Sequence, residues 1–179
     1  MRLNKEYKEI TSDILNNKKF NLLKNYTHHG TNKYDHCKRV SYLSFLFAKL
    51  IKCNCIEVAR GGLLHDFFFG TRIAKEENDY LKHPKTSVVN AKKYFSISEN
   101  EAKIIESHMY HCAIVKKYTP FLKKDDYDKK YFKENKPSNK ESVIVCISDL
   151  LVSIFEVIKY KLRYNTALYM LFLINVIRL

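Results

Sequence analysis

Apolar residues recur every three or four positions along most of the chain, which is the spacing of one face of an α-helix. In residues 3–24 they alternate with polar stretches, as in an amphipathic helix that leads into a domain. Between about Tyr34 and Lys52 they cover a wide face, which indicates a central helix. The next apolar helix runs from about Ile56 to Phe68, and its glycines, Gly61 and Gly62, permit close contact with a neighbouring helix.

The second half of the chain shows the same spacing, with clearer start signals. A helix is predicted from His83, where Pro84 suits an early helical position, to about Phe95. Ser98 and Glu101 have the spacing of a capping box and predict the start of another helix. Residues 112–139 lack a clean period, and an apolar helix returns from about 140 to 160.

No segment alternates in the way that predicts β-strands, and glycine (4) and proline (3) are scarce. We therefore predict an all-α, single-domain helical bundle over residues 1–179, with the motif-bearing core at about 28–156. A C-terminal helix at about 160–179 is expected to pack on the domain, although a dimer contact or a weak membrane-surface role is also open. Its apolar run, residues 167–174, is far shorter than the ~20 residues of a transmembrane helix.

The chain is strongly basic, with a formal net charge of +13 in which most of the basic residues are lysines. Such a charge favours phosphorylated partners, but it also fits a lysine-rich composition without a specific role. The lysines are spread along the chain, so they indicate no specific nucleic-acid partner. The five cysteines form no CxxC pair, and the N-terminus lacks the apolar core of a signal peptide. Both features predict free thiols in a cytoplasmic protein.

His65 and Asp66 stand side by side at the end of an apolar helix, where packing alone gives no reason for them. Both side chains are good ligands for divalent metals. Asp149 lies inside another apolar stretch, where an ionised carboxylate is costly unless it is paired or bound to a metal. A buried partner such as histidine or arginine is the alternative explanation for Asp149. Three further histidines precede helices or lie within them: His36, His83 and His108.

The order of these six residues resembles the HD-domain family of metal-dependent phosphohydrolases. The local contexts agree over roughly residues 28–156, from Tyr34-Asp35-His36 to Ser148-Asp149-Leu150. The resemblance implies that one metal is held by the first histidine, the doublet and the last aspartate, and a second by the two remaining histidines with the shared aspartate. It thus assigns His36, His65, Asp66, His83, His108 and Asp149 as metal ligands, with Asp66 also catalytic.

The reaction implied is attack of a metal-bound hydroxide on a phosphate ester of a small molecule, for which we expect a nucleotide. Mixed nitrogen and oxygen ligands suit one or two ions of Mn, Fe, Co, Ni or Zn. Where the cyclic-dinucleotide branch of the family has Ile-Gly-Lys after the doublet, this chain has Phe67-Phe68-Phe69, which puts hydrolysis of cyclic dinucleotides in doubt.

Substrate binding then requires other cations or histidines, each of which is otherwise an ordinary surface residue. The candidates are Lys33, Arg39, Arg72, His111 and Lys140. His111 also competes with His108 as a ligand, because the two lie three positions apart. His28 and His29 belong to a loop that either lines the site or simply faces solvent.

Two other functions are compatible with the sequence. A minority of HD-type proteins are di-iron oxygenases, and the ligand set alone does not exclude that reaction. A non-enzymatic nucleotide- or RNA-binding module would use the basic charge instead, and its binding would be salt-sensitive. The presence of all six ligand candidates favours an enzyme.

Overall fold

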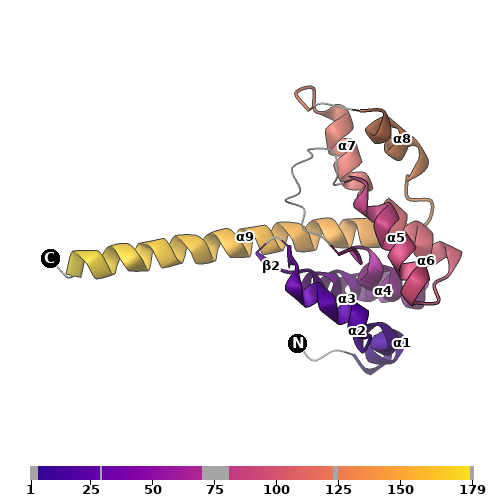
Figure 1. Cartoon of the computed structure of the whole chain (residues 1–179), viewed down its shortest axis with the longest axis horizontal. Coiled ribbons are helices and arrows are strands. Elements are labelled where there is room, and N and C mark those ends of the chain that lie inside the picture. The colour runs from indigo at the N-terminus through magenta and orange to yellow at the C-terminus, as the bar shows by residue number, and fades with distance from the viewer. Residues whose placement is uncertain (1–3, 29, 70–80, 123–124, 178–179) are drawn as a thin grey trace.

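The computed structural model describes residues 4–28, 30–69, 81–122 and 125–177, with side chains as far as residue 167. The predicted all-α fold is confirmed (Figure 1). The helices of the first half are α1 (Lys5–Leu15), α2 (Lys18–Asn21), the 3-10 turn η1 (Leu22–Asn25), α3 (Lys33–Ile51) and α4 (Cys55–Leu64). Those of the second half are α5 (His83–Tyr94), α6 (Glu99–Ser107), α7 (Tyr110–Tyr118), α8 (Asp126–Glu134) and α9 (Lys140–Ile177).

One small hairpin precedes α3 and is the only sheet among the described residues. Strand β1 (Thr27–His28) pairs antiparallel with β2 (Thr31–Asn32). Gly30 at its tip has a φ of 78°, a conformation that L residues rarely adopt. A Cβ at Gly30 would also overlap the ring of Tyr160 on α9, so the tip of the hairpin lies against that helix.

Side-chain caps start the helices where the sequence offers them. Asn32 accepts a hydrogen bond from the Asp35 backbone and so begins α3. The predicted capping box is present, with reciprocal hydrogen bonds between Ser98 and Glu101 at the start of α6. A second capping box, from Asp125 to Asp128, begins α8 inside the stretch that lacks a clean period, where a solvated loop or a short irregular helix was expected. Short helices of this kind carry too few apolar residues to show a period.

Helices α3 and α4 pack closely at the centre of the fold, because two glycines of α4 lie where it meets α3 and α6. A Cβ at Gly62 would lie 2.9 Å from the Cα of Ser41 on α3. At Gly61 it would lie 2.6 Å from Ile104 on α6. Arg60 ties α4 to α1 and α6 through hydrogen bonds of 2.8 Å to Asp13 and to Glu101. The close approach expected from these small residues is thus confirmed.

The C-terminal segment differs from the expected separate packing helix. It continues α9 without a break, and α9 projects well beyond the body of the molecule (Figure 1). Residues 153–177 contain no glycine or proline, so nothing in the sequence ends the helix. The side chains from Ile158 to Ala167 are exposed, although Tyr160 meets the hairpin at Gly30. No helix among the described residues is long and apolar enough to cross a membrane.

Candidate metal centre

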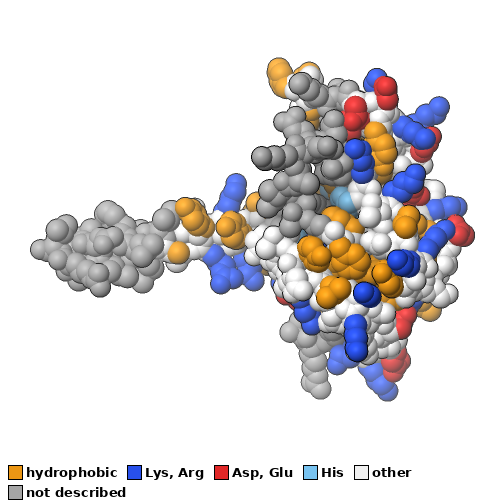
Figure 2. All heavy atoms as spheres, viewed as in Figure 1, with side chains coloured by type: hydrophobic (Ala, Val, Ile, Leu, Met, Phe, Trp, Pro, Cys, Tyr) orange, Lys and Arg blue, Asp and Glu red, His pale blue; other side chains and the backbone are white. Residues whose placement is uncertain are grey.

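The predicted ligands come from five different helices or their ends and meet in the interior of the body. His36 lies in the first turn of α3, His65 and Asp66 directly follow α4, and Asp149 lies on α9. His83 begins α5 and His108 directly follows α6. All six are buried, none more than 6% exposed, which agrees with the small area of histidine visible at the surface in Figure 2.

The first group of ligand atoms surrounds one carboxylate oxygen of Asp149. Its Oδ1 lies 3.2 Å from Nε2 of His36 and 3.7 Å from Nε2 of His65. The residues His36, His65 and Asp149 each offer one ligand atom to a common point. Asp149 therefore belongs with the doublet, although more than eighty residues separate them in the chain.

The second group surrounds Asp66. Its Oδ1 lies 2.9 Å from Nε2 of His83 and 3.6 Å from Nε2 of His108, and these two nitrogens are 2.9 Å apart. Asp66 also shares a possible metal position with His65 and His108, and another with His28 and His36. Asp66 therefore lies within reach of two different sets of histidines.

Hydrogen bonds to the other ring nitrogens fix how the histidines point. The Nδ1–H of His65 donates to the carbonyl of Gly62 at 2.8 Å, and that of His108 donates to Ile105 at 2.7 Å. Each bond leaves the Nε2 lone pair directed at the cluster. The Nε2 of His65 is buried without a hydrogen-bond partner among the described residues, as expected for an atom that binds a metal.

Glu156 supports His36 in a comparable way. Its Oε2 accepts a 2.9 Å hydrogen bond from Nδ1 of His36, and its Oε1 accepts one of 2.6 Å from Arg39. Burial by itself would lower the pKa of His36, but the hydrogen bonds to Asp149 and Glu156 outweigh it and raise that pKa to about 9. The pKa of His36 is raised because its ring lies between two acids, Asp149 and Glu156.

The pKa shifts of His65 and Asp149, the other two residues of the first group, favour the protonation states that bind a metal. Burial lowers the pKa of His65 to about 3, so its imidazole is neutral and able to bind a metal at neutral pH. Burial also opposes ionisation of Asp149, but the hydrogen bond from His36 and the nearby histidines hold its pKa well below the ordinary value. A neutral imidazole and an ionised carboxylate are the forms that coordinate divalent ions. The donor set therefore fits a transition metal.

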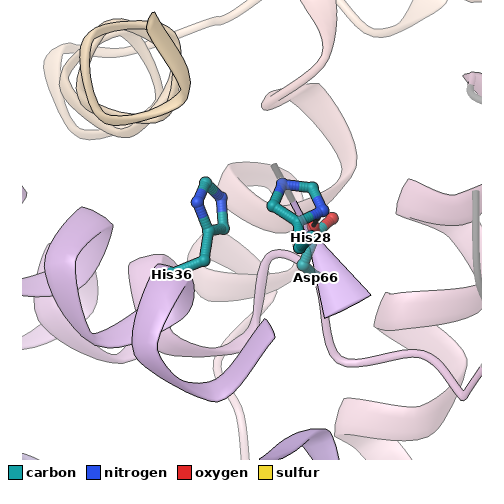
Figure 3. A group of neighbouring side chains, drawn as sticks. All are labelled: His28, His36 and Asp66. Atoms are coloured by element: carbon teal, nitrogen blue, oxygen red, sulfur yellow. Dashed lines mark ion pairs between the residues drawn. The ribbon is translucent and has the colours of Figure 1, made fainter. Parts of the chain in front are cut away.

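His28 also belongs to the cluster, a role that the sequence analysis left open. It lies at the end of β1, is buried, and its ring centroid is 4.2 Å from that of His36 (Figure 3). Its Nδ1 is 3.8 Å from Oδ2 of Asp66. Glu156 was not predicted at all. The signal for it was its spacing, because Glu156 follows Asp149 by seven residues and therefore lies on the same face of α9.

The predicted substrate-binding residues fall in different places. Arg39 lies beside the cluster through Glu156. Lys33 is buried and donates to the carbonyl of Phe68 at 3.2 Å, so it connects the start of α3 to the segment after the doublet. Lys140 begins α9, roughly 13 Å along the helix axis from Asp149. Arg72 and His29 lie outside the described residues.

His111 lies three residues after His108, and its Nδ1 contacts two groups that are not ligand candidates. Its Nδ1 donates to the carbonyl of His108 at 3.1 Å and lies 3.5 Å from the thiol of Cys146. Of the two histidines, His108 is the one whose Nε2 approaches Asp66. The geometry thus favours His108 over His111 as the ligand candidate.

Comparison with known families matches residues 34–153 to the HD domain. The chain belongs to the HD-domain family. The match covers more than half of the chain and includes every one of the six predicted ligands. HD domains are in general metal-dependent phosphohydrolases, and the buried His and Asp groups of this one could hold the metal. Comparisons with curated proteins and with solved structures found no match.

Proposed function

We propose that this HD domain is a metal-dependent phosphohydrolase that cleaves a phosphate ester, with a nucleotide as the expected substrate. The observation that supports the proposal is the sharing of Asp66 between two sets of imidazoles. One set is His28 with His36, and the other is His65 with His108, beside which His83 also approaches Asp66. Bound divalent ions would supply activation of a water molecule and neutralisation of charge on the phosphoryl oxygens.

The residues of this chain have separate tasks in that reaction. His36, His65 and Asp149 would hold one ion and His83 with His108 the other, while Asp66 spans the two. The hydrogen bonds to Gly62 and Ile105 prevent the rings of His65 and His108 from turning away. We propose no protein nucleophile for this reaction, because water activated at the bound ions would attack the phosphorus atom.

The apolar residues after the doublet exclude water from one side of the cluster. Phe67 is fully buried, and the ring of Phe68 stacks on His83 at 4.9 Å between centroids. Lys33 lies over the ring of Phe68 and donates a hydrogen bond to the carbonyl of the same residue. A low-dielectric wall of this kind strengthens the interaction between phosphoryl oxygens and cations.

The test is hydrolysis by protein loaded with Mn, Co or Ni, on a panel of phosphomonoesters, phosphodiesters and nucleotides. We expect Asp66→Asn and Asp149→Asn to lose activity by at least 10²-fold and to bind less metal. Asp126→Asn, whose carboxylate is exposed on α8, is the matched control and should behave as wild type. Full activity in the Asp66→Asn protein, or iron-dependent oxygen consumption without phosphate release, would refute the proposal.

A further inference from the structure

A second feature of the structure adjoins Glu156, the acid that is hydrogen-bonded to His36. It is a pocket of about 510 Å³ between the β1–β2 hairpin, the start of α3 and the part of α9 that leaves the body. This volume is in the range of pockets that hold small organic ligands. Its principal side chains are Thr31, Arg39, Phe155, Lys159, Tyr160, Arg163 and Tyr164.

The pocket is positively charged. Arg39, Lys159 and Arg163 line it, and Glu156 is the one carboxylate among its described lining residues. Glu156 is already bonded to Arg39 and to His36, so its charge is shared with them. Neither Lys159 nor Arg163 has a carboxylate within salt-bridge distance among the described residues. Two cations are thus available to an incoming anion.

Lys159 and Arg163 are arranged to act together. They lie four positions apart on α9, and side chains at this spacing project from the same side of a helix. Figure 2 shows basic side chains gathered on α9 just outside the body. Guanidinium and ammonium groups in such a pair match the oxygens of phosphate groups.

Aromatic side chains form the rest of the pocket wall. Phe155, Tyr160 and Tyr164 line it, and each is more than half exposed (58%, 55% and 57%). Tyr160 is supported on one side by the backbone of Gly30, so its position is fixed by the hairpin. Exposed aromatic rings next to cations are the combination that binds a nucleobase and its phosphates, since every base has a face that stacks.

We propose that this pocket binds a nucleotide, with its phosphates on Lys159 and Arg163 and its base against Tyr160 and Tyr164. Two sources of such a ligand are possible. It is either the remote part of the substrate, in which case the assignment rests on the proposed function, or a separate nucleotide that acts on the metal centre through Arg39, Glu156 and His36. Both sources require the same binding chemistry.

The binding step is tested in chelator-treated full-length protein, where the metal centre does not hold phosphate. Calorimetric titration would compare ADP, adenosine and pyrophosphate as probes. We expect ADP to bind at least tenfold more tightly than either adenosine or pyrophosphate, because only ADP uses both the cations and the rings. No ADP binding, or ADP binding no tighter than that of pyrophosphate, would overturn the assignment.

Two double variants assign the contacts. Lys159→Glu with Arg163→Glu should weaken ADP and pyrophosphate binding tenfold or more. Tyr160→Ala with Tyr164→Ala should weaken ADP but leave pyrophosphate within twofold. The matched control is Lys133→Glu with Lys136→Glu, which makes the same change in net charge at exposed positions on and after α8. Equal loss in the control would show that only the overall charge matters and would overturn the proposal.

Turnover by the metal-loaded protein then separates the sources. If the pocket holds part of the substrate, the Lys159/Arg163 variant raises KM for nucleotides by at least tenfold more than it raises KM for p-nitrophenyl phosphate, which has no base or second phosphate to reach the pocket. If it holds a separate nucleotide, ADP changes the kcat for p-nitrophenyl phosphate in wild type and not in the variant. If ADP binds but neither nucleotides nor p-nitrophenyl phosphate are hydrolysed, the proposed function is refuted and the assignment of the nucleotide pocket remains.

Discussion

His36 and Glu156 are 120 positions apart in the chain and are joined by a 2.9 Å hydrogen bond. The bond connects the first turn of α3 to α9 and places a buried acid behind the ring nitrogen that faces away from the cluster. Carboxylates in this position fix the orientation of a metal-binding imidazole and increase its basicity.

Replacing Glu156 by Gln should weaken metal binding about 10- to 100-fold, because the amide keeps an acceptor for His36 but loses the charge. Competition with a chelating dye would measure the affinity for Mn or Co. Glu134→Gln, at an exposed position on α8, is the control and should bind like wild type. Equal affinity in the two variants would contradict the role given to Glu156.

The contact between α3 and α4 depends on Gly62. Gly62→Ala should destabilise the protein by about 1–3 kcal/mol, because the added methyl meets the backbone of Ser41, which cannot rotate away. This loss exceeds the ~1 kcal/mol that alanine gains over glycine in a helix. Urea denaturation would measure the difference.

Glu9→Ala, at an exposed position on α1, serves as the control for Gly62→Ala and should stay within about 0.5 kcal/mol of wild type. A Gly62→Ala protein as stable as wild type would mean that α3 and α4 can separate without cost. The positions of His36 and His65 would then not be fixed by this contact.

A buried ion pair holds α8 against α7. Lys116 pairs with Asp128, and both side chains are less than a tenth exposed. Lys116→Met should cost about 3–5 kcal/mol, because it leaves a buried carboxylate without its cation. Adding Asp128→Asn to Lys116→Met should recover part of that loss, as measured by thermal and urea unfolding.

The exposed pair Lys129–Asp126 on the same helix provides the comparison for Lys116. Lys129→Met should change stability by no more than about 1 kcal/mol, since solvent screens that pair. If Lys116→Met and Lys129→Met have the same small effect, the Lys116–Asp128 pair does not stabilise the fold.

Tyr7 should make the protein sensitive to alkaline pH. Its hydroxyl donates to Ser41 at 2.9 Å, and burial raises its pKa well above the ordinary value of 10. The folded state therefore favours the protonated phenol, so its contribution is complete below about pH 10 and is lost as pH rises above that value. Stability measured in urea should fall between about pH 10 and 11.

Tyr7→Phe should be less stable than wild type at neutral pH, by about 1 kcal/mol for the lost hydrogen bond. It should also lose less stability than wild type between pH 9 and 11. Burial raises the pKa of Tyr131 as well, so some alkaline sensitivity remains in the variant. An identical pH profile for the two proteins would show that Tyr7 does not ionise on unfolding.

Part of the candidate site could be predicted from the sequence because its polar residues interrupt the apolar pattern of the helices. His65, Asp66 and Asp149 interrupt apolar stretches, and a polar group in a buried position needs a partner wherever that partner lies. Glu156 and His28 escaped the same reasoning for different reasons. Glu156 stands where the apolar run of α9 gives way to polar residues, and His28 lies in a hairpin too short to show any period.

The sequence by itself determined the helical class and the positions of most long helices, because burial gives each helix a period of apolar residues that can be read along the chain. The six ligand candidates followed from their order in the chain, which resembles that of the HD-domain family. Only the tertiary structure decided which of these residues meet, how α9 continues beyond the body, and that Arg39, Lys159 and Arg163 surround one pocket. Helical periodicity predicts which face of a helix is buried. It does not predict which residues pack against that face, because these depend on how the helices cross.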